Sequence, residues 1–208
     1  MAIKPSAIFS VFTFASLGLL TNMASAQSWE PLFNGKDLTG WHTQPGGEWK
    51  VVDGVIVGTS ASSERRHGLL VSDRELTNFI LRAKFRVREG NSGLYFRAEE
   101  TDTNVAVRGF QAEVDRSSAV GGLYETAMRG WVRKPDPDVI ENIVTHGEWV
   151  NITVTAIDDD VTVSLNGTTV TELLGDKESL KKGRIALQLH GGQNMHVEFK
   201  DIAVLKLP

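Results

Sequence analysis

The chain has 208 residues, with 22 lysines and arginines against 26 aspartates and glutamates, and a formal net charge of −4. It contains no cysteine, which excludes disulfides, thiolate metal sites and cysteine nucleophiles. Its basic clusters do not exceed pairs such as Arg65-Arg66 and Lys181-Lys182. A nucleic-acid partner, which requires phosphate neutralisation, is therefore not expected.

Residues 1–26 have the pattern of a secretory signal peptide. Lys4 gives a positive start, an apolar run follows over residues 7–20, and Ala24-Ser25-Ala26 supplies a small-x-small cleavage pattern. The apolar run is too short for a comfortable transmembrane helix. We therefore expect a periplasmic or secreted bacterial protein with no membrane attachment after cleavage, and a single domain over residues 27–208.

Short alternating segments separated by Gly, Asn and Asp predict strands rather than helices. Asp53-Gly54 and Asn166-Gly167 are hairpin-turn signals. In chain order, strands are expected as a hairpin over residues 49–58, then over 68–72, 79–88, 91–97, 109–115, 150–157, 161–165, 168–172, 183–190 and 196–207. This spacing predicts an all-β sandwich of two antiparallel sheets.

Two other segments do not alternate. Residues 117–147 are expected to form one long irregular region, and such regions in a compact domain are usually functional or disordered. Residues 176–182 are expected to form a brief helical turn. Three tryptophans at framework positions, Trp41, Trp49 and Trp149, are expected in the core.

Two of the predicted strands carry an unusual polar face. In the sequence GFQAEVD, Gln111, Glu113 and Asp115 share one face, because strand side chains alternate with period two. In the sequence NSGLYFR, Tyr95 and Arg97 share the face opposite the apolar residues. An amide, two carboxylates, a phenol and a guanidinium suit a polar, uncharged ligand such as a sugar.

The pair Glu113 and Asp115 could supply acid–base chemistry on a glycoside. Glycosidases of the laminarinase type use a longer Glu-x-Asp-x-Glu run, and Ser117 stands where the second Glu would be. The alternative is a pair of surface carboxylates bound to arginines. Arg97 is a plausible partner for Glu113, either as a structural ion pair or as a group that binds sugar oxygens.

His190 ends a predicted strand beside Gln188, and two glycines follow it. Imidazole is well matched to proton transfer near neutral pH, although a lone histidine at a strand end is often structural. In the long segment, Trp131 is a candidate for stacking on a sugar ring. The five histidines show no paired metal-ligand spacing, so no metal site is predicted.

Several motifs occur in a recognisable order. They are LFNGKDLTGW (32–41), EWKVVDG (48–54), NSGLYFR (91–97), GFQAEVD (109–115), GGLY (121–124), GEWVN (147–151), the segment 183–191 and VEFKDI (197–202). Together they resemble the 3-keto-disaccharide hydrolase family, also described as 3-keto-glucoside lyase and hydratase and formerly as domain of unknown function 1080. The resemblance covers essentially all of residues 27–208 and implies a concanavalin A-like jelly-roll sandwich.

The resemblance also implies a small oxidised sugar or glycoside as substrate. A base would remove the C2 proton of a 3-keto-glycoside, the aglycone would leave by β-elimination, and water would add afterwards. Glu113 and His190 would be base and acid, in an order left open, with Arg97 (alternatively Gln111) holding the keto oxygen. The implied substrate-binding residues are Gln111, Asp115, Tyr95, Tyr124, Trp131 and Gln188.

A divalent cation could polarise the ketone, but the sequence has no ligand set that demands one, so the cofactor is left open. Two other functions remain open. One is a non-catalytic, lectin-like carbohydrate-binding module on the same fold. The other is a conventional glycoside hydrolase acting directly on a β-glucan. The aglycone, the linkage and the oligomeric state are also open.

Overall fold

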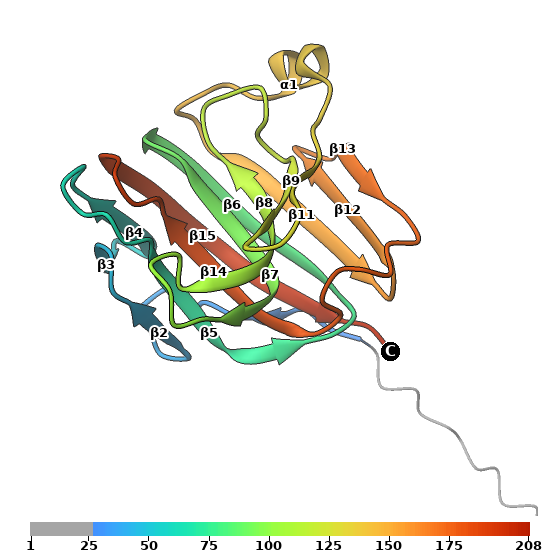
Figure 1. Ribbon diagram of the computed structural model, residues 1–208, viewed down its shortest axis with the longest axis horizontal. Coiled ribbons are helices and arrows are strands. Elements are labelled where there is room, and N and C mark those ends of the chain that lie inside the picture. Colours follow the sequence, from blue (N-terminus) through green and yellow to red (C-terminus); the bar gives the residue numbers. More distant parts are fainter. Residues whose placement is uncertain (1–26) are drawn as a thin grey trace, which may run out of the picture.

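The computed structural model describes residues 27–208 as two antiparallel sheets packed face to face (Figure 1). The predicted signal peptide, residues 1–26, lies outside the described residues. The eight-stranded sheet has the order β13 (Thr168–Leu173), β12 (Asp160–Leu165), β11 (Val150–Ile157), β6 (Phe79–Glu89), β15 (Met195–Lys206), β4 (Val55–Ser60) and β3 (Glu48–Val52), with β1 (Glu30–Pro31) paired to β15.

The seven-stranded sheet covers one face of the eight-stranded sheet. Its order is β10 (Gly130–Arg133), β9 (Leu123–Thr126), β8 (Val107–Val114), β7 (Ser92–Glu100), β14 (Gly183–Leu189), β5 (Gly68–Leu76) and β2 (Trp41–Gln44). A short helix, α1 (Pro137–Ile143), follows β10. Within residues 27–208, no helix is long and apolar enough to cross a membrane.

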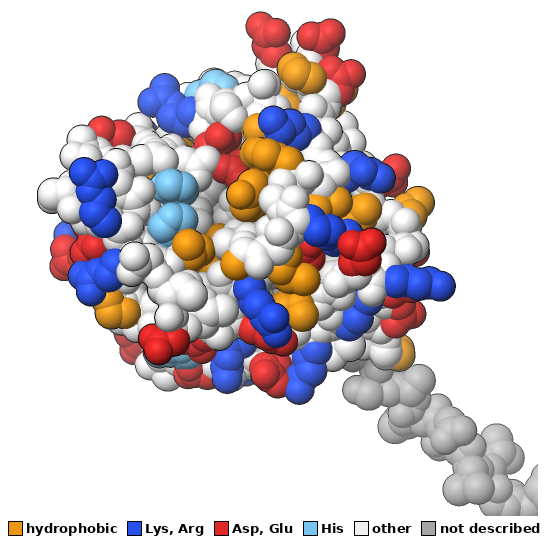
Figure 2. Space-filling view, in the orientation of Figure 1, with side chains coloured by type: hydrophobic (Ala, Val, Ile, Leu, Met, Phe, Trp, Pro, Cys, Tyr) orange, Lys and Arg blue, Asp and Glu red, His pale blue; other side chains and the backbone are white. Residues whose placement is uncertain are grey.

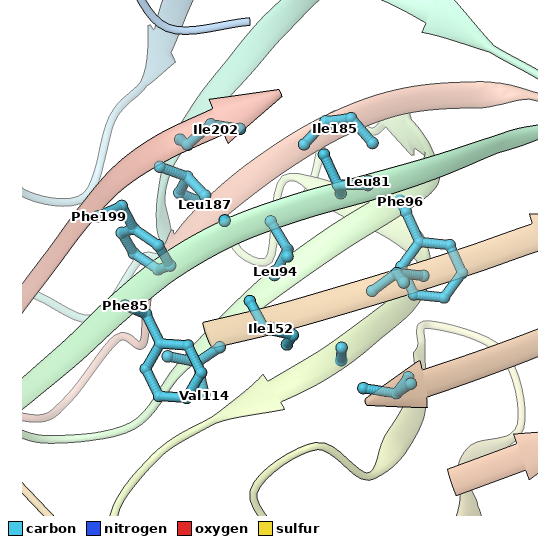
Figure 3. Packing of buried hydrophobic residues seen from close by; sticks show 14 of the residues in the cluster. Leu81, Phe85, Leu94, Phe96, Val114, Ile152, Ile185, Leu187, Phe199 and Ile202 are labelled. Carbon is cyan, nitrogen blue, oxygen red and sulfur yellow. The ribbon is translucent and has the colours of Figure 1, made fainter. Parts of the chain in front are cut away.

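The main core lies between the two sheets, where both contribute every second side chain (Figure 3). Strand β6 illustrates the alternation, with Phe79, Leu81 and Phe85 buried and Arg82 and Lys84 between them directed outward. On the facing sheet, Leu94 and Phe96 of β7 point into the same core. The two-sheet antiparallel sandwich predicted from the alternation is confirmed.

A smaller apolar cluster lies on the other face of the seven-stranded sheet. It consists of Leu69, Val71, Tyr95, Ala98, Ala106, Val107 and Ala186. Tyr95 belongs to this cluster because it alternates with Leu94 and Phe96, which face the main core. The connection from β7 to β8 supplies Ala106 and covers part of this outer face.

Two predicted irregular or helical segments differ from the structure. Residues 117–147 are not one irregular region, since they contain β9, β10 and α1. Residues 176–182 do not form a helical turn. The carboxylate of Asp176 binds the Arg129 guanidinium at 2.8 and 2.9 Å, and Lys181 binds the Asp176 carbonyl oxygen. These side-chain contacts favour an irregular, bent loop over local helical bonds.

The three framework tryptophans divide into two groups. Trp41 and Trp49 are buried in the core, as expected. Trp149 is only half-buried, and its ring lies beneath the Arg86 guanidinium at 4.5 Å and the Lys200 ammonium at 4.2 Å. The prediction for Trp149 was wrong because two cations from the outer face of the eight-stranded sheet cover an indole at its surface.

Candidate functional site

A cavity of about 410 Å³ opens on the outer face of the seven-stranded sheet. One side of the cavity is polar and is lined by Gln111, Glu113 and Gln188 on strands and by His67, Asn91 and His190 next to strand ends. The hairpin of β9 and β10 supplies the opposite wall, with Tyr124, Thr126, Ala127 and Trp131, and Val105 and Gln193 complete the lining. Figure 2 shows histidine side chains beside a hollow on one face of the molecule, with acidic and hydrophobic side chains nearby.

Strand alternation on β8 places Gln111 and Glu113 in this cavity, because Phe110, Ala112 and Val114 fill the core. On the neighbouring strand, Gly93 pairs with Glu113. A Cβ atom at Gly93 would lie 2.6 Å from Gln111 Oε1. Because Gly93 has no side chain, the space beside it is free for the side chain of Gln111.

Glu113 is the most perturbed carboxyl group of the cavity. It is 3% exposed and accepts hydrogen bonds from Asn91 Nδ2 and from Gln111 Nε2, the latter at 2.9 Å. Burial, together with the nearby Asp115 charge, raises the pKa of Glu113 to about 7, although the two hydrogen bonds oppose the shift. A carboxyl group with this pKa can both donate and accept a proton near neutral pH.

His190 lies against a second histidine, His67, that the sequence reading did not single out. Leu189 pairs with Gly68 across β14 and β5, so the residues that follow and precede them come together. The two imidazole centroids are 4.3 Å apart. Burial, together with the neighbouring His190, lowers the pKa of His67 to about 4, which keeps the ring neutral at pH 7. This contact depends on the β5–β14 register, so the sequence carried no local signal for it.

A buried chain of hydrogen bonds runs beneath the cavity. Gln188 Nε2 donates to His67 Nδ1 at 3.0 Å and to the Tyr95 hydroxyl at 2.9 Å. The Tyr95 hydroxyl lies 2.8 Å from Thr126 Oγ1. Gln188 lines the cavity as expected, whereas Tyr95 is fully buried below it. Tyr95 is thus placed to hold Gln188 in position rather than to contact a ligand.

The aromatic wall consists of Tyr124 and Trp131, which the sequence placed in the long segment. Their rings meet edge to face, with centroids 5.4 Å apart. Trp131 is 41% exposed, and the Lys134 ammonium lies 4.5 Å from its ring. Both residues line the cavity, where an accessible indole can pack against a sugar ring.

Arg97 does not lie in the cavity, so its expected pairing with Glu113 was wrong. The β7–β8 register shifts after Phe96, and Arg97 has φ +47°. Ala98 instead joins the outer-face cluster. The Arg97 guanidinium is buried and donates to Thr77 O, Asp158 O and Asn78 Oδ1 at 2.8, 2.8 and 3.2 Å. Arg97 therefore ties two turns together at one end of the sandwich.

Asp115 also lies outside the lining of this cavity. Its carboxylate accepts a hydrogen bond from the Ser117 amide at 3.0 Å and one from the Ser117 hydroxyl at 2.6 Å. Asn91 Nδ2 is 3.5 Å from Asp115 Oδ2 and also bonds Glu113. Because β8 ends at Val114, Asp115 caps the following turn and acts on Glu113 through its charge.

A larger cavity of about 540 Å³ lies on the eight-stranded sheet. Lys84 and Asp201 on its lining form an ion pair at 3.0 Å. No buried titratable group opens into this cavity among residues 27–208. We therefore assign the candidate site to the smaller cavity. In the described part of the chain, no cluster of three or more His, Asp or Glu side chains is arranged to hold a metal ion.

Comparison with known families gives a direct match. The model of the 3-keto-alpha-glucoside-1,2-lyase-like domain matches residues 28–205. The chain belongs to this family. The resemblance deduced from the motifs is thereby confirmed. No curated protein sequence matches this chain.

Solved structures with the same architecture share little sequence with this chain. A candidate glycosyl hydrolase from Parabacteroides distasonis ATCC 8503 is 22% identical, with a TM-score of 0.65 over 86% of this chain and 94% of that chain. A Bacillus subtilis protein of unknown function with a galectin-like fold is 15% identical, with a TM-score of 0.62 over 86% and 94%. The carbohydrate-binding module CBM66 from Bacillus subtilis is 15% identical, with a TM-score of 0.60 over 80% and 96%. The concanavalin A-like sandwich is therefore confirmed.

Proposed function

We propose that this protein is an exported, carbohydrate-active enzyme that cleaves 3-keto-glycosides by C2 proton removal and β-elimination, followed by hydration. The observation that carries the proposal is Glu113, a buried carboxyl group with a pKa of about 7 in a polar cavity. Membership of the 3-keto-alpha-glucoside-1,2-lyase-like family supports the same chemistry. The cavity volume of about 410 Å³ lies within the usual range for small-molecule sites.

The reaction needs a base, an acid and a group that stabilises an enolate. The C3 ketone makes the C2 proton acidic, and the base removes this proton. The electron pair of the broken C2–H bond forms a C1–C2 double bond as the C1–O bond breaks, and the leaving oxygen takes a proton from the acid. Addition of water across the double bond, with oxygen at C1 and hydrogen at C2, completes a net hydrolysis.

Glu113 and His190 are the two groups that this scheme uses for proton transfer, and both line the same cavity. Gln111 and Gln188 line the cavity beside these two groups and would bind the sugar. Their Nε2 atoms also bond Glu113 and His67, so both amides hold cavity residues in position. Trp131 and Tyr124 would pack against the ring or the aglycone.

A non-catalytic carbohydrate-binding module is the second candidate function. The structural likeness to the CBM66 module supports it, because that protein has the same architecture. A conventional β-glucan hydrolase is less well supported, since it needs two carboxyl groups flanking the scissile bond. Asp115, the carboxylate that directly follows β8, is bound by Ser117 and does not line the cavity.

The variant Glu113→Gln separates an enzyme from a binding module. For the enzyme, kcat on a 3-keto-glycoside should fall by about 10²–10⁴-fold, while the dissociation constant for the sugar should change little. For a binding module, wild type and variant should bind equally and neither should release product. Glu99→Gln, which removes an exposed carboxylate paired with Arg108 on β8, is the matched control and should keep full activity.

A further inference from the structure

The two stacked histidines of the cavity have different fixed partners at Nδ1. His67 Nδ1 lies 3.0 Å from Gln188 Nε2. An amide nitrogen carries hydrogens and can only donate, so His67 Nδ1 must be the acceptor. A neutral imidazole has one N–H group. The proton of His67 is therefore on Nε2.

His190 has the opposite arrangement. Its Nδ1 lies 2.9 Å from the carbonyl oxygen of Gly191, which can only accept. His190 Nδ1 must therefore carry a proton, and its Nε2 holds the lone pair whenever the ring is neutral. His67 thus has a hydrogen-bond donor at Nε2, and neutral His190 has a base at Nε2.

The orientation of the Gln188 amide, on which the His67 assignment depends, follows from the surroundings of its oxygen: Gln188 Oε1 has no partner within residues 27–208, so the flipped amide would bury two N–H hydrogens without an acceptor. The other Nε2 hydrogen of Gln188 is directed to the Tyr95 hydroxyl at 2.9 Å, and that hydroxyl can then donate to Thr126 Oγ1 at 2.8 Å. Gln188 and Tyr95 are both buried, so water does not compete for these bonds. Within residues 27–208, His67 Nε2 has no hydrogen-bond partner, and the residue lines the cavity.

The charge state of His67 agrees with this tautomer. Burial and the adjacent His190 ring hold the pKa of His67 at about 4, so the ring is neutral at pH 7. A neutral imidazole N–H can stabilise an enolate by hydrogen bonding. Because the ring is neutral, it does not repel the positive charge that His190 gains when it takes a proton. The family resemblance implied that Arg97, or alternatively Gln111, holds the keto oxygen. Arg97 lies outside the cavity and cannot bind this oxygen.

We propose that His67 is a catalytic residue whose Nε2–H donates a hydrogen bond to the C3 carbonyl oxygen of the keto sugar. This proposal rests on the function proposed above and deepens it. As His190 Nε2 takes the C2 proton, the electron pair moves toward the C3 oxygen, where the His67 hydrogen bond strengthens. Glu113 then protonates the leaving oxygen. In the hydration step, Glu113 takes a proton from the water that adds to C1, and His190 returns its proton to C2.

The first test measures the tautomers directly and needs no activity. Protein comprising residues 27–208, labelled with ¹⁵N at histidine, is studied at pH 7 by long-range ¹H–¹⁵N correlation spectra, with His67→Gln used for assignment. We expect a neutral Nε2–H ring for His67 and an Nδ1–H form for neutral His190. A His67 ring that is protonated at pH 7, or that carries its proton on Nδ1, would overturn the proposal.

The second test measures turnover of 3-keto-trehalose by His67→Phe and His67→Gln. Removing the donor should lower kcat by about 10²–10³-fold with little change in KM, because the bond strengthens as charge develops. Glutamine can still donate and should stay within about tenfold of wild type. His196→Gln, on the exposed face of the eight-stranded sheet, is the control and should remain fully active.

The outcomes separate the two proposals. An active wild type with an equally active His67→Phe variant would overturn the role of His67 alone. Equal losses in the Phe and Gln variants, with both folded by their unfolding midpoints, would overturn the donor role. A wild type that does not turn over the keto sugar would reject the proposed function, and the catalytic role of His67 with it.

Discussion

Glu113 should make the protein less stable as the pH rises toward 8, and glutamine at this position should remove that effect. Burial raises the pKa of Glu113 from 4.5 to about 7. The folded state therefore binds the proton more tightly than the unfolded chain does. The resulting stabilisation is fully present below about pH 4.5 and is lost as the pH rises through 7.

The size of the effect follows from the shift. One pKa unit corresponds to about 1.4 kcal/mol, so Glu113 should contribute roughly 3 kcal/mol less to the unfolding free energy at pH 8 than at pH 4. The variant Glu113→Gln is neutral at both pH values. Its unfolding free energy relative to wild type should therefore grow by roughly 3 kcal/mol between pH 4 and pH 8.

Urea titrations followed by tryptophan fluorescence at half-unit pH steps would measure this difference, since the chain has five tryptophans. Subtracting the wild-type curve removes the contributions of other titrating groups, His67 among them. Glu99→Gln is the control, because an exposed ion pair should shift stability by less than about 1 kcal/mol across the range. A variant-minus-wild-type difference that stays flat from pH 4 to pH 8 would refute the reasoning about Glu113.

Three further substitutions test other parts of the account. Arg97→Met should cost about 2–4 kcal/mol of unfolding free energy, because it removes three guanidinium hydrogen bonds, and it should leave kcat of the folded protein unchanged. A variant with wild-type stability and a lower kcat would show instead that Arg97 acts in the site. Trp131→Ala should raise KM by about tenfold with little change in kcat, and an unchanged KM would exclude stacking. Gly93→Ala should displace Gln111 and lower kcat/KM by at least about tenfold, whereas wild-type kinetics would show that Gln111 is dispensable.

The strand-forming segments could be predicted because their alternation matches the structure. Residues 150–157 form β11 over the predicted span, and β6 differs from its predicted span by one residue. The same alternation correctly placed Gln111 and Glu113 on one face of β8. These features depend on period-two patterning within single strands, which is a local property of the sequence.

Arg97 and the contact between His67 and His190 could not be predicted in this way. A register shift after Phe96 turns Arg97 away from the face that alternation assigns to it. The histidine pair depends on which strands are neighbours and in which register, and neither is encoded locally.

The helix within residues 117–147 did have a local signal. Asp136 caps α1 by accepting from the Asp138 amide, and Pro137 occupies the first turn, a combination typical of helix starts. With only seven residues, α1 gives too short an apolar pattern for periodicity to reveal it. Strands β9 and β10 have four residues each, and their alternation is too short to predict them for the same reason.

The central claim is that this protein cleaves a sugar because the sugar carries a ketone at C3. The most direct measurement incubates residues 27–208 with 3-keto-trehalose and with unoxidised trehalose, follows the sugar products over time, and repeats both with EDTA to test the divalent-cation alternative. We predict product from the keto sugar alone. Binding of the keto sugar without any product, or cleavage of unoxidised sugar at a comparable rate, would contradict the account.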